Sequence, residues 1–468
     1  MLLERFYDED LAQASYMIGC QAKGEALVID ARRDIAPYLK LAEEQGMKIT
    51  AVTETHIHAD YLSGTRELAA ATGAEIYISG EGGKDWTYGF EGTILKDGDS
   101  FNLGNIKIQA VHTPGHTPEH MSFLVTDGAF TDTPGYMFTG DFVFVGDLGR
   151  PDLLDEAAGF VDTRFAGARD LFKSLKEKFV DLPDHVQIHP AHGAGSACGK
   201  ALGSIPSSTV GYERLYAWWA KYIDNDDEQG FIDELLDGQP EAHSYFARMK
   251  TQNKVGPAVM GERKPLEEVP AEKLAKDLDS GFVDLLDTRD HHEVREGTVP
   301  GAIAVPGTGK TATFAAWIID PEAEDYKPMV VLAQDQDDAM RIWDHLVRVG
   351  IDDVVGYVES LDGLKVEPVK TVKPEDLADF DKSMVLDVRA KTEYAEGNIP
   401  EAHQLHSSQV LWKLEQLPPK DTKDPIVIHC QSMARSMAVG SALRRAGYDV
   451  VELEGAYPAW EKAVGANQ

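Results

Sequence analysis

The stretch THIHADYLSG (residues 55–64) directly follows an apolar run, KITAVTE, that has the composition of a β-strand. His56 and His58 are two positions apart, so their side chains share one face if the chain is extended there, and Asp60 follows. Imidazole and carboxylate groups are ligands for Zn, Fe or Mn in proteins. The stretch therefore predicts a metal site at a strand end, where a stiff backbone can hold ligands in place.

Three further candidate ligands lie in similar settings. His116 occupies the turn TPGHTP, Asp141 ends the apolar run YMFTGD, and His192 lies in HPAHG. The recurrence of ligand-type residues at the ends of strand-like runs, all within the first 192 residues, indicates one shared metal centre rather than separate structural roles.

Length and composition place the chain among multidomain globular proteins. Its 468 residues exceed what one hydrophobic core organises, and its 43% hydrophobic and 26% charged content is ordinary. The formal net charge of -34 argues against nucleic acid or an anionic membrane surface as a partner. The three cysteines give no disulfide framework, no apolar run is long enough to span a membrane, and MLLERFYDED lacks a signal pattern, so a cytoplasmic location is expected.

The chain divides into four segments by pattern. Residues 1–250 alternate strand-like runs with short helices and end in a helical extension over 206–250. The segment 251–270, rich in Gly, Pro and charge, is predicted to be a linker. Two α/β domains of about 100 residues each follow, at 271–368 and 369–468. The strands expected in the first segment span 48–56, 74–80, 106–116, 120–128, 136–141 and 185–193, and helices are expected over 67–73 and 162–181.

The last two segments contain an internal repeat with a constant offset of 100 residues. The repeated positions are Asp287, Arg289, Glu293, Gly297, Pro300 and Ala302, which recur as Asp387, Arg389, Glu393, Gly397, Pro400 and Ala402. Each copy then runs through an apolar strand, MVVL (329–332) or IVIH (426–429), into a loop and a helix that ends near Gly350 or Gly447. This pattern predicts two related α/β domains.

The second copy carries a candidate nucleophile. Its strand leads directly into Cys430, and the loop CQSMARS (430–436) precedes a helix. Backbone N–H groups of such a loop can surround one sulfur atom, and the positive end of the helix adds to their effect, which stabilises a thiolate or a persulfide. Arg435 adds a fixed positive charge for an anionic sulfur compound. We therefore expect an exposed, reactive Cys430 with Arg435 as its catalytic partner.

The first copy lacks this chemistry. Alignment on the glycines that end the two helices places Ala333 opposite Cys430 and Asp338 opposite Arg435. A methyl group cannot carry a sulfur atom, and a carboxylate repels an anion, so this copy is expected to be catalytically silent.

The two remaining cysteines have different settings. Cys20 lies in SYMIGCQAKG, a predicted first hairpin in which core packing is the ordinary role. Cys198 lies six residues after His192, so it is a candidate functional thiol close to the metal.

The N-terminal motifs resemble the metallo-β-lactamase superfamily over residues 10–205, which implies an αββα sandwich with metal at the edge of two facing sheets. The usual first motif is His-x-His-x-Asp-His, whereas Tyr61 stands here at the last position, a change that weakens a second metal site. THIHADYLSG, TPGHTPEH, FTGDFVFVGDLGRPDL and the PAHG segment resemble the persulfide dioxygenase branch more closely. That resemblance implies one Fe(II) per chain, held by His56, His116 and Asp141, with open positions for substrate sulfur, O2 and water.

The same resemblance gives roles to other polar residues. His58, Asp60 and His192 are implied to orient the metal ligands and to handle protons. Arg150 is implied to bind an anionic part of the thiol substrate, because a guanidinium suits a carboxylate or a phosphate. A structural salt bridge is an equally good interpretation of Arg150 from the residues alone.

Residues 375–465 resemble a rhodanese domain through the Cys-x4-Arg loop, the repeated signature and GAYPAW (455–460). Phosphatases also use a Cys-to-Arg loop but need one more residue in it, so the four residues between Cys430 and Arg435 favour sulfur over phosphate. The whole chain thus resembles the fusion of an iron persulfide dioxygenase with one silent and one active rhodanese domain.

This resemblance implies an enzyme with two linked reactions. A low-molecular-weight thiol persulfide and O2 would give sulfite at the iron, and a persulfide on Cys430 would form or use thiosulfate. A homo-oligomer is expected, and the identity of the thiol and the direction of sulfur flow stay open. Two rival functions remain, namely a two-metal thioester hydrolase of the glyoxalase II type and a sulfur-carrier or sensor protein without turnover.

Overall fold

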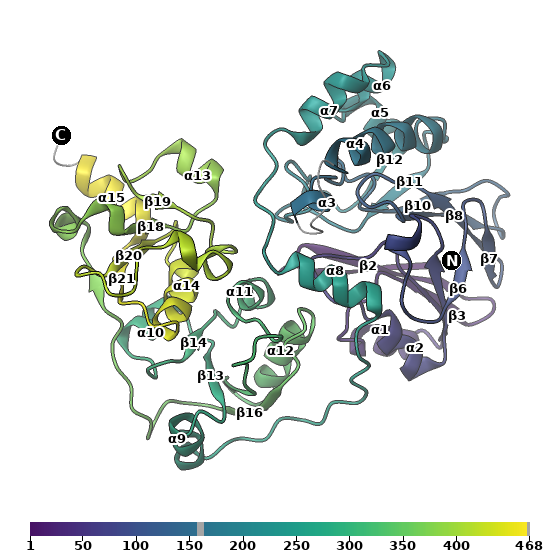
Figure 1. The fold of residues 1–468 in the computed structure, drawn as a ribbon. Helices are drawn as coiled ribbons and strands as arrows, with labels where there is room; N and C mark the ends of the chain where they lie inside the picture. Colours follow the sequence, from purple (N-terminus) through teal and green to yellow (C-terminus); the bar gives the residue numbers. More distant parts are fainter. Residues whose placement is uncertain (157–162, 466–468) are drawn as a thin grey trace. The chain divides into compact units, whose positions relative to one another are not determined.

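The computed structural model describes residues 1–156 and 163–465 (Figure 1). The chain folds into two compact units, of which the first contains the predicted metal motifs and the second contains the predicted repeat. The first unit comprises Met1–Ala242 with Phe246–Arg263, and the second comprises His243–Tyr245 with Lys264–Gln468. Within the described ranges, no helix is long and apolar enough to cross a membrane.

Two six-stranded sheets form the first unit. The strand order is β1-β2-β3-β4-β5-β6 in one sheet and β12-β11-β10-β9-β8-β7 in the other. A buried apolar cluster joins their inner faces, because it contains Tyr16, Leu27 and Ile29 from the first sheet and Ile108 and Phe123 from the second. Helices pack on both outer faces, so the unit is the αββα sandwich that the sequence motifs implied.

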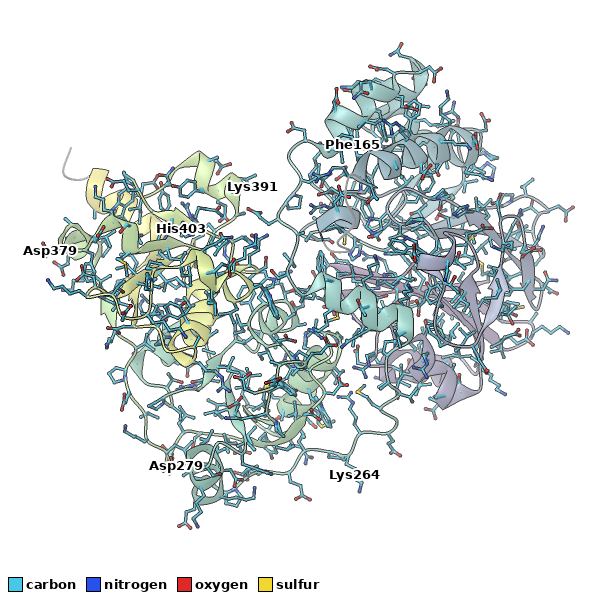
Figure 2. All side chains as sticks on the ribbon, viewed as in Figure 1. Phe165, Lys264, Asp279, Asp379, Lys391 and His403 are labelled. Carbon is cyan, nitrogen blue, oxygen red and sulfur yellow. The ribbon has the colours of Figure 1, made fainter. Side chains whose placement is uncertain are left out.

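The expected strands and helices are all present in this unit, together with further strands that were not expected, and Figure 2 shows the side chains that these elements carry. The first sheet contains β1 (Leu2–Asp8), β2 (Gln13–Cys20), β3 (Glu25–Ile29), β4 (Lys48–Thr53), β5 (Glu75–Ser79) and β6 (Thr93–Leu95). The second contains β7 (Ser100–Leu103), β8 (Ile106–His112), β9 (Met121–Asp127), β10 (Tyr136–Gly140), β11 (Gln187–Pro190) and β12 (Ser208–Thr209). Helices α1 (Ala36–Glu44) and α2 (Thr65–Thr72) cover the first sheet, and α4 (Thr163–Ser174), α5 (Val210–Tyr216), α6 (Ala220–Asp224) and α7 (Glu228–Leu236) cover the second. Residue 162, the expected start of α4, lies outside the described residues.

The topology brings the strand ends that precede the predicted ligands to one edge. Strands β8, β9 and β10 alternate in direction and β10 is parallel to β11, so β8, β10 and β11 end at the same edge. His116, Asp141 and His192 follow these three strands. Gly140 permits the tight turn before Asp141, because its φ is 52° and a Cβ there would lie 2.6 Å from the Thr55 hydroxyl oxygen.

The segment after the sandwich differs from the predicted linker, 251–270. Helix α8 (Phe246–Val255) occupies its beginning. Arg66 then donates to the carbonyls of residues 256 and 257, and Glu67 accepts from the N–H groups of residues 260 and 261. These hydrogen bonds hold the chain against the first unit as far as residue 261, because α2 presents an arginine and a glutamate side by side.

The second unit contains two α/β modules, called here the silent module (residues 271–368) and the thiol module (residues 369–468). Their sheets have the strand orders β14-β13-β15-β16 and β17-β21-β20-β18-β19, with parallel pairing throughout. The silent module contains α9 (Ala271–Asp279), β13 (Asp284–Asp287), α10 (His291–Glu296), β14 (Ile303–Ala304), α11 (Thr311–Ile318), β15 (Met329–Leu332), α12 (Gln336–Val347) and β16 (Val354–Val358). The thiol module contains β17 (Thr371–Val372), β18 (Val385–Asp387), α13 (Lys391–Glu396), β19 (His403–Gln404), β20 (Ile426–His429), α14 (Ala434–Arg445), β21 (Val450–Leu453) and α15 (Ala456–Gly465).

The repeated signature makes the same contacts in both modules. Arg289 in the silent module and Arg389 in the thiol module each form an ion pair with the aspartate two residues earlier. Each also donates to the carbonyl of the glycine eight residues later, at 2.7 Å in both cases. One arginine therefore ties a strand end to the end of the following helix, which is why these positions recur at a fixed offset.

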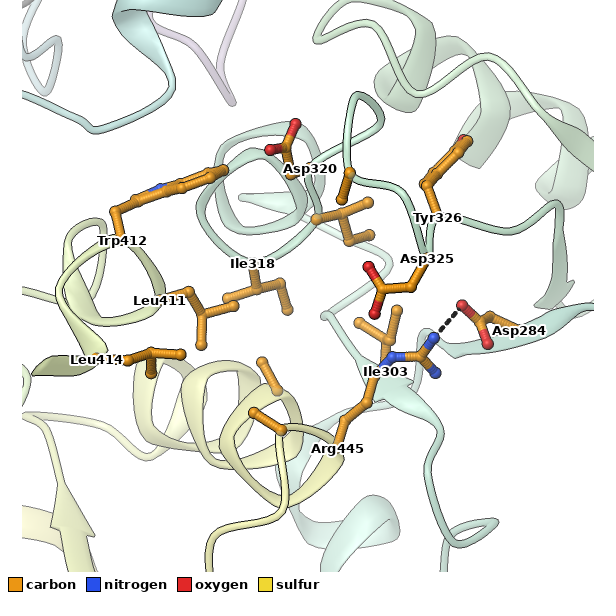
Figure 3. Close-up of a pocket in the computed structure, with 14 residues that line it drawn as sticks. Asp284, Ile303, Ile318, Asp320, Asp325, Tyr326, Leu411, Trp412, Leu414 and Arg445 are labelled. Carbon is orange, nitrogen blue, oxygen red and sulfur yellow. Dashed lines mark hydrogen bonds and ion pairs between the residues drawn. The ribbon is translucent and has the colours of Figure 1, made fainter. Parts of the chain in front are cut away.

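The two modules pack against each other around α14 and leave a cavity of about 310 Å³ between them (Figure 3). Ile318 and Leu411 contribute to its mostly apolar wall, and the ring of Trp412 lies at its edge. At one side Arg445, the last residue of α14, forms an ion pair with Asp284 of the silent module. The silent module therefore contacts the helix that follows the predicted nucleophile.

Candidate metal centre and thiol site

Three of the predicted ligands meet at the edge of the sandwich. His56, His116 and Asp141 are buried, and each offers one ligand atom that lies within 4.8 Å of the other two. The Nε2 atoms of His56 and His116 lie 3.9 Å and 3.5 Å from Oδ2 of Asp141. Two imidazoles and one carboxylate form the set that suits a non-haem Fe(II) ion with open coordination positions.

The state of these side chains also fits a cation. Both carboxylate oxygens of Asp141 are buried, and no residue in the described ranges donates a hydrogen bond to either. A buried charge without a donor is costly unless a counter-ion neutralises it. Burial lowers the pKa of both His56 and His116, which keeps the imidazoles neutral and their lone pairs available to a metal.

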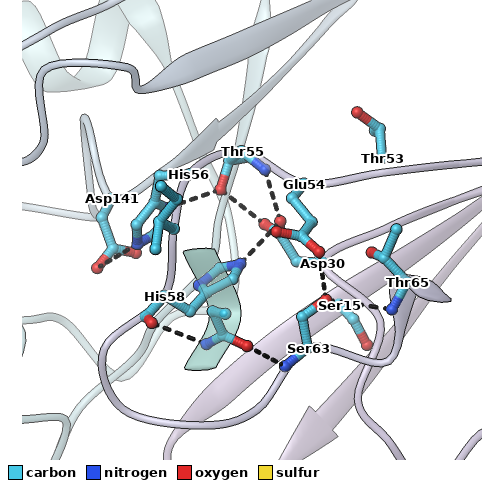
Figure 4. Close-up of polar contacts among 12 residues, drawn as sticks. Ser15, Asp30, Thr53, Glu54, Thr55, His56, His58, Ser63, Thr65 and Asp141 are labelled. Atoms are coloured by element: carbon cyan, nitrogen blue, oxygen red, sulfur yellow. Dashed lines mark hydrogen bonds and ion pairs between the residues drawn. The ribbon is translucent and has the colours of Figure 1, made fainter. Parts of the chain in front are cut away.

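Hydrogen bonds at the other ring nitrogen fix the direction of each histidine. Nδ1 of His116 donates to the carbonyl of Arg150 at 2.9 Å, and Nδ1 of His56 donates to the Thr55 hydroxyl at 3.0 Å. That hydroxyl accepts, because its own proton is donated to Asp30 at 2.9 Å (Figure 4). Both Nε2 atoms are therefore left as acceptors that face the shared carboxylate.

His58 lies outside this ligand group. Its Nε2 atom is 3.1 Å from Oδ1 of Asp30, as Figure 4 shows. Burial opposes protonation of His58, but the Asp30 carboxylate outweighs it and raises the pKa of His58 to about 9. Asp30 also accepts from the N–H group of Thr55 at 2.7 Å. The Asp30 carboxylate therefore contacts the loop between β4 and α2 (residues 54–64, called here the metal loop) at both Thr55 and His58.

Asp60, His192 and Cys198 form a second group, whose candidate ligand atoms also lie within 4.8 Å of one another. Nε2 of His192 lies 3.4 Å from Oδ2 of Asp60 and 3.6 Å from Oδ1 of Asp141, so the two groups adjoin. Nδ1 of His192 donates to the carbonyl of Ala12 at 3.0 Å. Burial raises the pKa of Cys198 to about 11, which favours its thiol form. The fold thus brings Cys198 beside the metal centre.

Tyr61 belongs to neither group of candidate ligands. Its buried hydroxyl donates to the carbonyl of Asp30 at 3.0 Å and accepts from the side chain of Gln13 at 3.3 Å. The phenol therefore links the metal loop to the backbone of Asp30 and to the side chain of Gln13.

Arg150 is buried, with only 1% of its surface exposed. Its guanidinium forms a bidentate ion pair with Asp152 and donates to the carbonyl of Ala197 at 3.0 Å. These are the contacts of a structural ion pair, one of the two roles that the sequence left open. The Arg150 backbone also contributes to the centre through its hydrogen bond with His116.

Two supports of the centre, Asp30 and His120, were not singled out from the sequence. His120 accepts from the N–H group of Asp141 at 3.0 Å, and its Nδ1 donates to Thr113 at 2.8 Å. Burial lowers the pKa of His120 well below its usual value, which leaves the ring neutral and able to accept. The only available signal was the second histidine of TPGHTPEH.

Asn253 of α8 is a third support, and its side-chain amide spans the metal loop. Nδ2 donates to the carbonyls of His58 at 2.8 Å and Tyr61 at 2.7 Å, and Oδ1 accepts from the N–H group of Ser63 at 2.9 Å. The side chain is buried and its amide groups are paired with the loop. Because Asn253 is 190 residues away from Ser63, no local pattern could have linked them.

Glu119 lies beside the same loop and is completely buried. Its Oε1 atom accepts from the N–H group of Ile57 at 2.8 Å. Burial, only partly offset by this hydrogen bond, raises the pKa of Glu119 to about 7. Deprotonation of Glu119 therefore works against the folded state at neutral pH.

In the thiol module, Cys430 directly follows β20, and its side chain is completely buried. This corrects the expectation of an exposed cysteine, because the loop folds over the sulfur. Sγ of Cys430 lies 3.5 Å from the hydroxyl of Ser436 in the first turn of α14. The carbonyl of Cys430 accepts from the N–H group of Tyr457 at 3.0 Å. The thiol thus lies at the positive end of a helix.

Arg435 forms a bidentate ion pair with Glu393, with distances of 2.6 Å and 2.8 Å. Glu393 also accepts from the N–H group of Ala390 at 2.9 Å. Burial opposes ionisation of Glu393, but Arg435 outweighs it and lowers the pKa of Glu393. Glu393 is one of the repeated signature residues, and the structure gives it a role beside the thiol loop.

The silent module fills the corresponding loop with its own carboxylates. Ala333 directly follows β15. Asp335 accepts from the N–H group of Asp338 at 2.8 Å, and Asp338 accepts from the N–H group of Gln334 at 3.0 Å. Asp338 also pairs with Arg341. Two backbone N–H groups of this loop are therefore already paired with carboxylates.

Comparison with known proteins agrees with this division. Residues 8–192 match the metallo-beta-lactamase superfamily, and residues 270–366 and 374–463 match the rhodanese-like domain. A solved metallo-beta-lactamase structure from Staphylococcus aureus subsp. aureus COL is 39% identical, with a TM-score of 0.67, and the match covers 76% of this chain and 98% of that chain.

Two curated relatives each match less than half of this chain. The mitochondrial persulfide dioxygenase ETHE1 of Homo sapiens is 28% identical over 194 residues, which is 41% of this chain and 68% of that protein. The probable polyketide biosynthesis zinc-dependent hydrolase BaeB of Bacillus velezensis is 26% identical over 208 residues, which is 44% of this chain and 84% of that protein.

The fold and the donor set define a metalloenzyme-type α/β sandwich joined to a module with a buried thiol. The chain belongs to the metallo-β-lactamase superfamily and continues into two rhodanese-like domains.

The substitution Asn253→Asp is expected to weaken Fe(II) binding by about 10- to 100-fold, the usual effect of losing a residue that orients metal ligands. The new carboxylate oxygen would face the carbonyls of His58 and Tyr61 and release the loop. Anaerobic competition with a chromophoric chelator measures the affinity. Thr251→Ala, at an exposed position of the same helix, should bind Fe(II) like the wild type. Equal affinities for all three proteins would contradict a role of Asn253 at the centre.

The substitution Glu119→Gln is expected to flatten the pH dependence of stability. The pKa of Glu119 is about 7 in the folded chain against a usual value of 4.5, so the folded state binds the proton more tightly. The wild-type free energy of unfolding should therefore fall, relative to the variant, by about 2 kcal/mol between pH 5.5 and pH 8. Chemical denaturation at the two pH values, with a chelator present, measures the difference. Parallel pH profiles would show that Glu119 does not titrate in this range.

Proposed function

We propose that the first unit is a non-haem Fe(II) persulfide dioxygenase. The observation that supports this proposal most directly is the buried group of His56, His116 and Asp141, whose two imidazoles and one carboxylate leave coordination positions for small molecules. The 28% identity to the persulfide dioxygenase ETHE1 of Homo sapiens also supports it. The proposed substrates are a low-molecular-weight thiol persulfide and O2.

The proposed reaction converts one persulfide, one O2 and one water molecule into a thiol, sulfite and two protons. The outer sulfur atom loses four electrons and O2 accepts four, so no further oxidant or reductant is needed. A bound Fe(II) ion would allow O2 to react with a closed-shell sulfur compound. His56 and His116 are held in direction by their Nδ1 hydrogen bonds, and burial of the group excludes bulk water.

His192 and Asp60 face the same space as the ligand group. Nε2 of His192 and Oδ2 of Asp60 lie 3.4 Å apart, close enough to share a proton. We assign to this pair the transfer of a proton to the thiol product. Arg150, which is buried and paired with Asp152, acts by orienting His116 rather than by binding the substrate.

The second proposed reaction takes place at Cys430. Its thiolate attacks the outer sulfur of thiosulfate, the sulfur–sulfur bond breaks, sulfite leaves and a cysteine persulfide remains. In the reverse direction sulfite attacks the persulfide and thiosulfate forms. The N-terminus of α14 stabilises the anionic sulfur, and Arg435, held by Glu393, adds positive charge to the loop. Because both proposed sites lie on one chain, sulfite formed at the first site has a high effective concentration at Cys430.

A two-metal thioester hydrolase is the second candidate for the first unit. The group of Asp60, His192 and Cys198 beside Asp141 favours it, because a second ion could share that carboxylate. The match to the zinc-dependent hydrolase BaeB also points in this direction. Tyr61 weakens this alternative, since its hydroxyl is bound to Asp30 and not to the second group.

Anaerobic iron analysis followed by O2 uptake with glutathione persulfide or coenzyme A persulfide separates these candidates. The wild type should hold one iron per chain and consume one O2 for each sulfite formed. His116→Ala should abolish uptake, because one of the three ligands is lost. Cys430→Ser should retain O2 uptake and lose thiosulfate formation, since it leaves the first unit intact.

Two zinc ions per chain with thioester hydrolysis and no O2 uptake would replace the dioxygenase proposal by the hydrolase. Absence of turnover in both the wild type and the two variants would instead indicate a sulfur carrier or sensor.

A further inference from the structure

One face of α14 rests on the silent module along its whole length. Met433, which precedes the helix, and Met437, Ser441 and Arg445 within it are each four residues apart and therefore share that face. All four side chains contact the silent module.

At the C-terminal end of α14 the contacts are polar. Arg445 forms an ion pair with Asp284 and donates to the carbonyl of Gly301 at 3.2 Å. One turn earlier, the hydroxyl of Ser441 accepts from the N–H group of Ala304 at 3.0 Å. These contacts fix the rotation of α14 against the strands of the silent module.

Nearer the thiol loop the contacts come from α10 of the silent module. Met437 packs in a buried cluster with Val294 and Ala304. Sδ of Met433 accepts a hydrogen bond from Nη1 of Arg295 at 3.1 Å. Met433 lies inside the loop that begins at Cys430, so the silent module touches the thiol loop itself.

Met433 adopts a backbone conformation that needs support. Its φ is 71°, in the left-handed region, which is unfavourable for a residue with a Cβ. Its carbonyl accepts from the hydroxyl of Ser436 at 3.0 Å and from the N–H group of Met437 at 2.9 Å. Ser436 in turn lies against Sγ of Cys430. A shift of Met433 would therefore move the groups that surround the sulfur.

Arg295 is placed to hold this conformation. Its carbonyl accepts from the N–H group of Val369 at 3.1 Å, which anchors the end of α10 to the chain between the modules. Its Nη2 atom is buried and has no hydrogen-bond partner among residues 1–156 and 163–465. The half-buried Arg295 guanidinium thus lies against the Met433 thioether with one nitrogen unpaired. This arrangement lowers the stability of the folded state, so stability alone does not explain it.

We propose that the silent module acts as a clamp for sulfur transfer, in which Arg295 is a positioning residue that holds Met433, and through it the Cys430 loop, in the conformation that stabilises an anionic sulfur. The inference rests on the proposed sulfurtransferase function of Cys430. It gives the copy without a nucleophile a role in the reaction of the copy that has one.

The substitution Arg295→Met in the full-length chain tests the clamp, because it keeps the length of the side chain and removes its donors. With thiosulfate as sulfur donor and cyanide as acceptor, kcat should fall about tenfold, which corresponds to about 1.4 kcal/mol in the barrier, while KM for thiosulfate changes little. The pH at which iodoacetamide alkylates Cys430 at half its maximal rate should rise, since the thiolate loses stabilisation. Arg295→Lys should restore part of the rate.

A double-mutant cycle with Met433→Gly separates positioning from loss of stability. Glycine adopts a φ of about 70° without a Cβ clash, so the loop should no longer need Arg295. Arg295→Met should then have little effect in the Met433→Gly background. If the substitution merely loosened the module, its effect would be the same in both backgrounds, and the clamp would be wrong.

Controls distinguish failure of the clamp from failure of the proposed function. Arg341→Met removes an arginine that bonds to Asp338 and Gly307 inside the silent module, and it should leave sulfur transfer unchanged. Cys430→Ser should abolish transfer. A wild type that forms no persulfide on Cys430 would overturn the sulfurtransferase function, and the clamp with it. An active wild type with an equally active Arg295→Met variant would overturn the clamp alone.

Discussion

The arrangement of the first unit depends on a buried negative charge that the described protein does not balance with hydrogen bonds. Both oxygens of Asp141 lack a hydrogen-bond donor among the described residues, and burial lowers the pKa of the neighbouring His56 and His116. Burial opposes protonation of His192 as well, but the Asp141 carboxylate, 3.6 Å away, raises the pKa of His192 well above its usual value. Such a site is suited to a cation, which would neutralise the buried carboxylate. Hydrogen bonds around the site keep its groups in place. Thr55 and the carbonyl of Arg150 orient the rings of His56 and His116 so that their Nε2 atoms face Asp141. His120 accepts from the backbone N–H group of Asp141.

The supports of the metal loop come from widely separated parts of the sequence. Asp30 directly follows β3 of the first sheet, His120 directly precedes β9 of the second, and Asn253 lies on α8, after both sheets. The last helix of the unit therefore belongs to the metal centre as much as to the core. This explains why the chain stays attached to the sandwich beyond α8 instead of becoming a free linker.

The two rhodanese-like modules share an architecture but differ in the loop that follows β15 in one module and β20 in the other. The same arginine closes the same turn in both, so each keeps the architecture. In the silent module carboxylates accept from the loop N–H groups of Gln334 and Asp338, whereas in the thiol module the Ser436 hydroxyl lies 3.5 Å from the thiol of Cys430. Contacts along one face of α14 join the silent module to the loop of the thiol module, and both modules belong to one compact unit.

Local patterns of the sequence determined the repeat, the missing nucleophile at Ala333 and six candidate ligands, namely His56, His58, Asp60, His116, Asp141 and His192. The sandwich and the choice of His56, His116 and Asp141 among these candidates were implied by the family resemblance. The sequence did not determine the burial of Cys430 or the pairing of Arg150 with Asp152. Those features, like the reach of Asn253 to the metal loop and of Arg295 to the thiol loop, depend on how distant segments pack. Tertiary structure alone decided them, since burial and long-range hydrogen bonds leave no periodic trace in the chain.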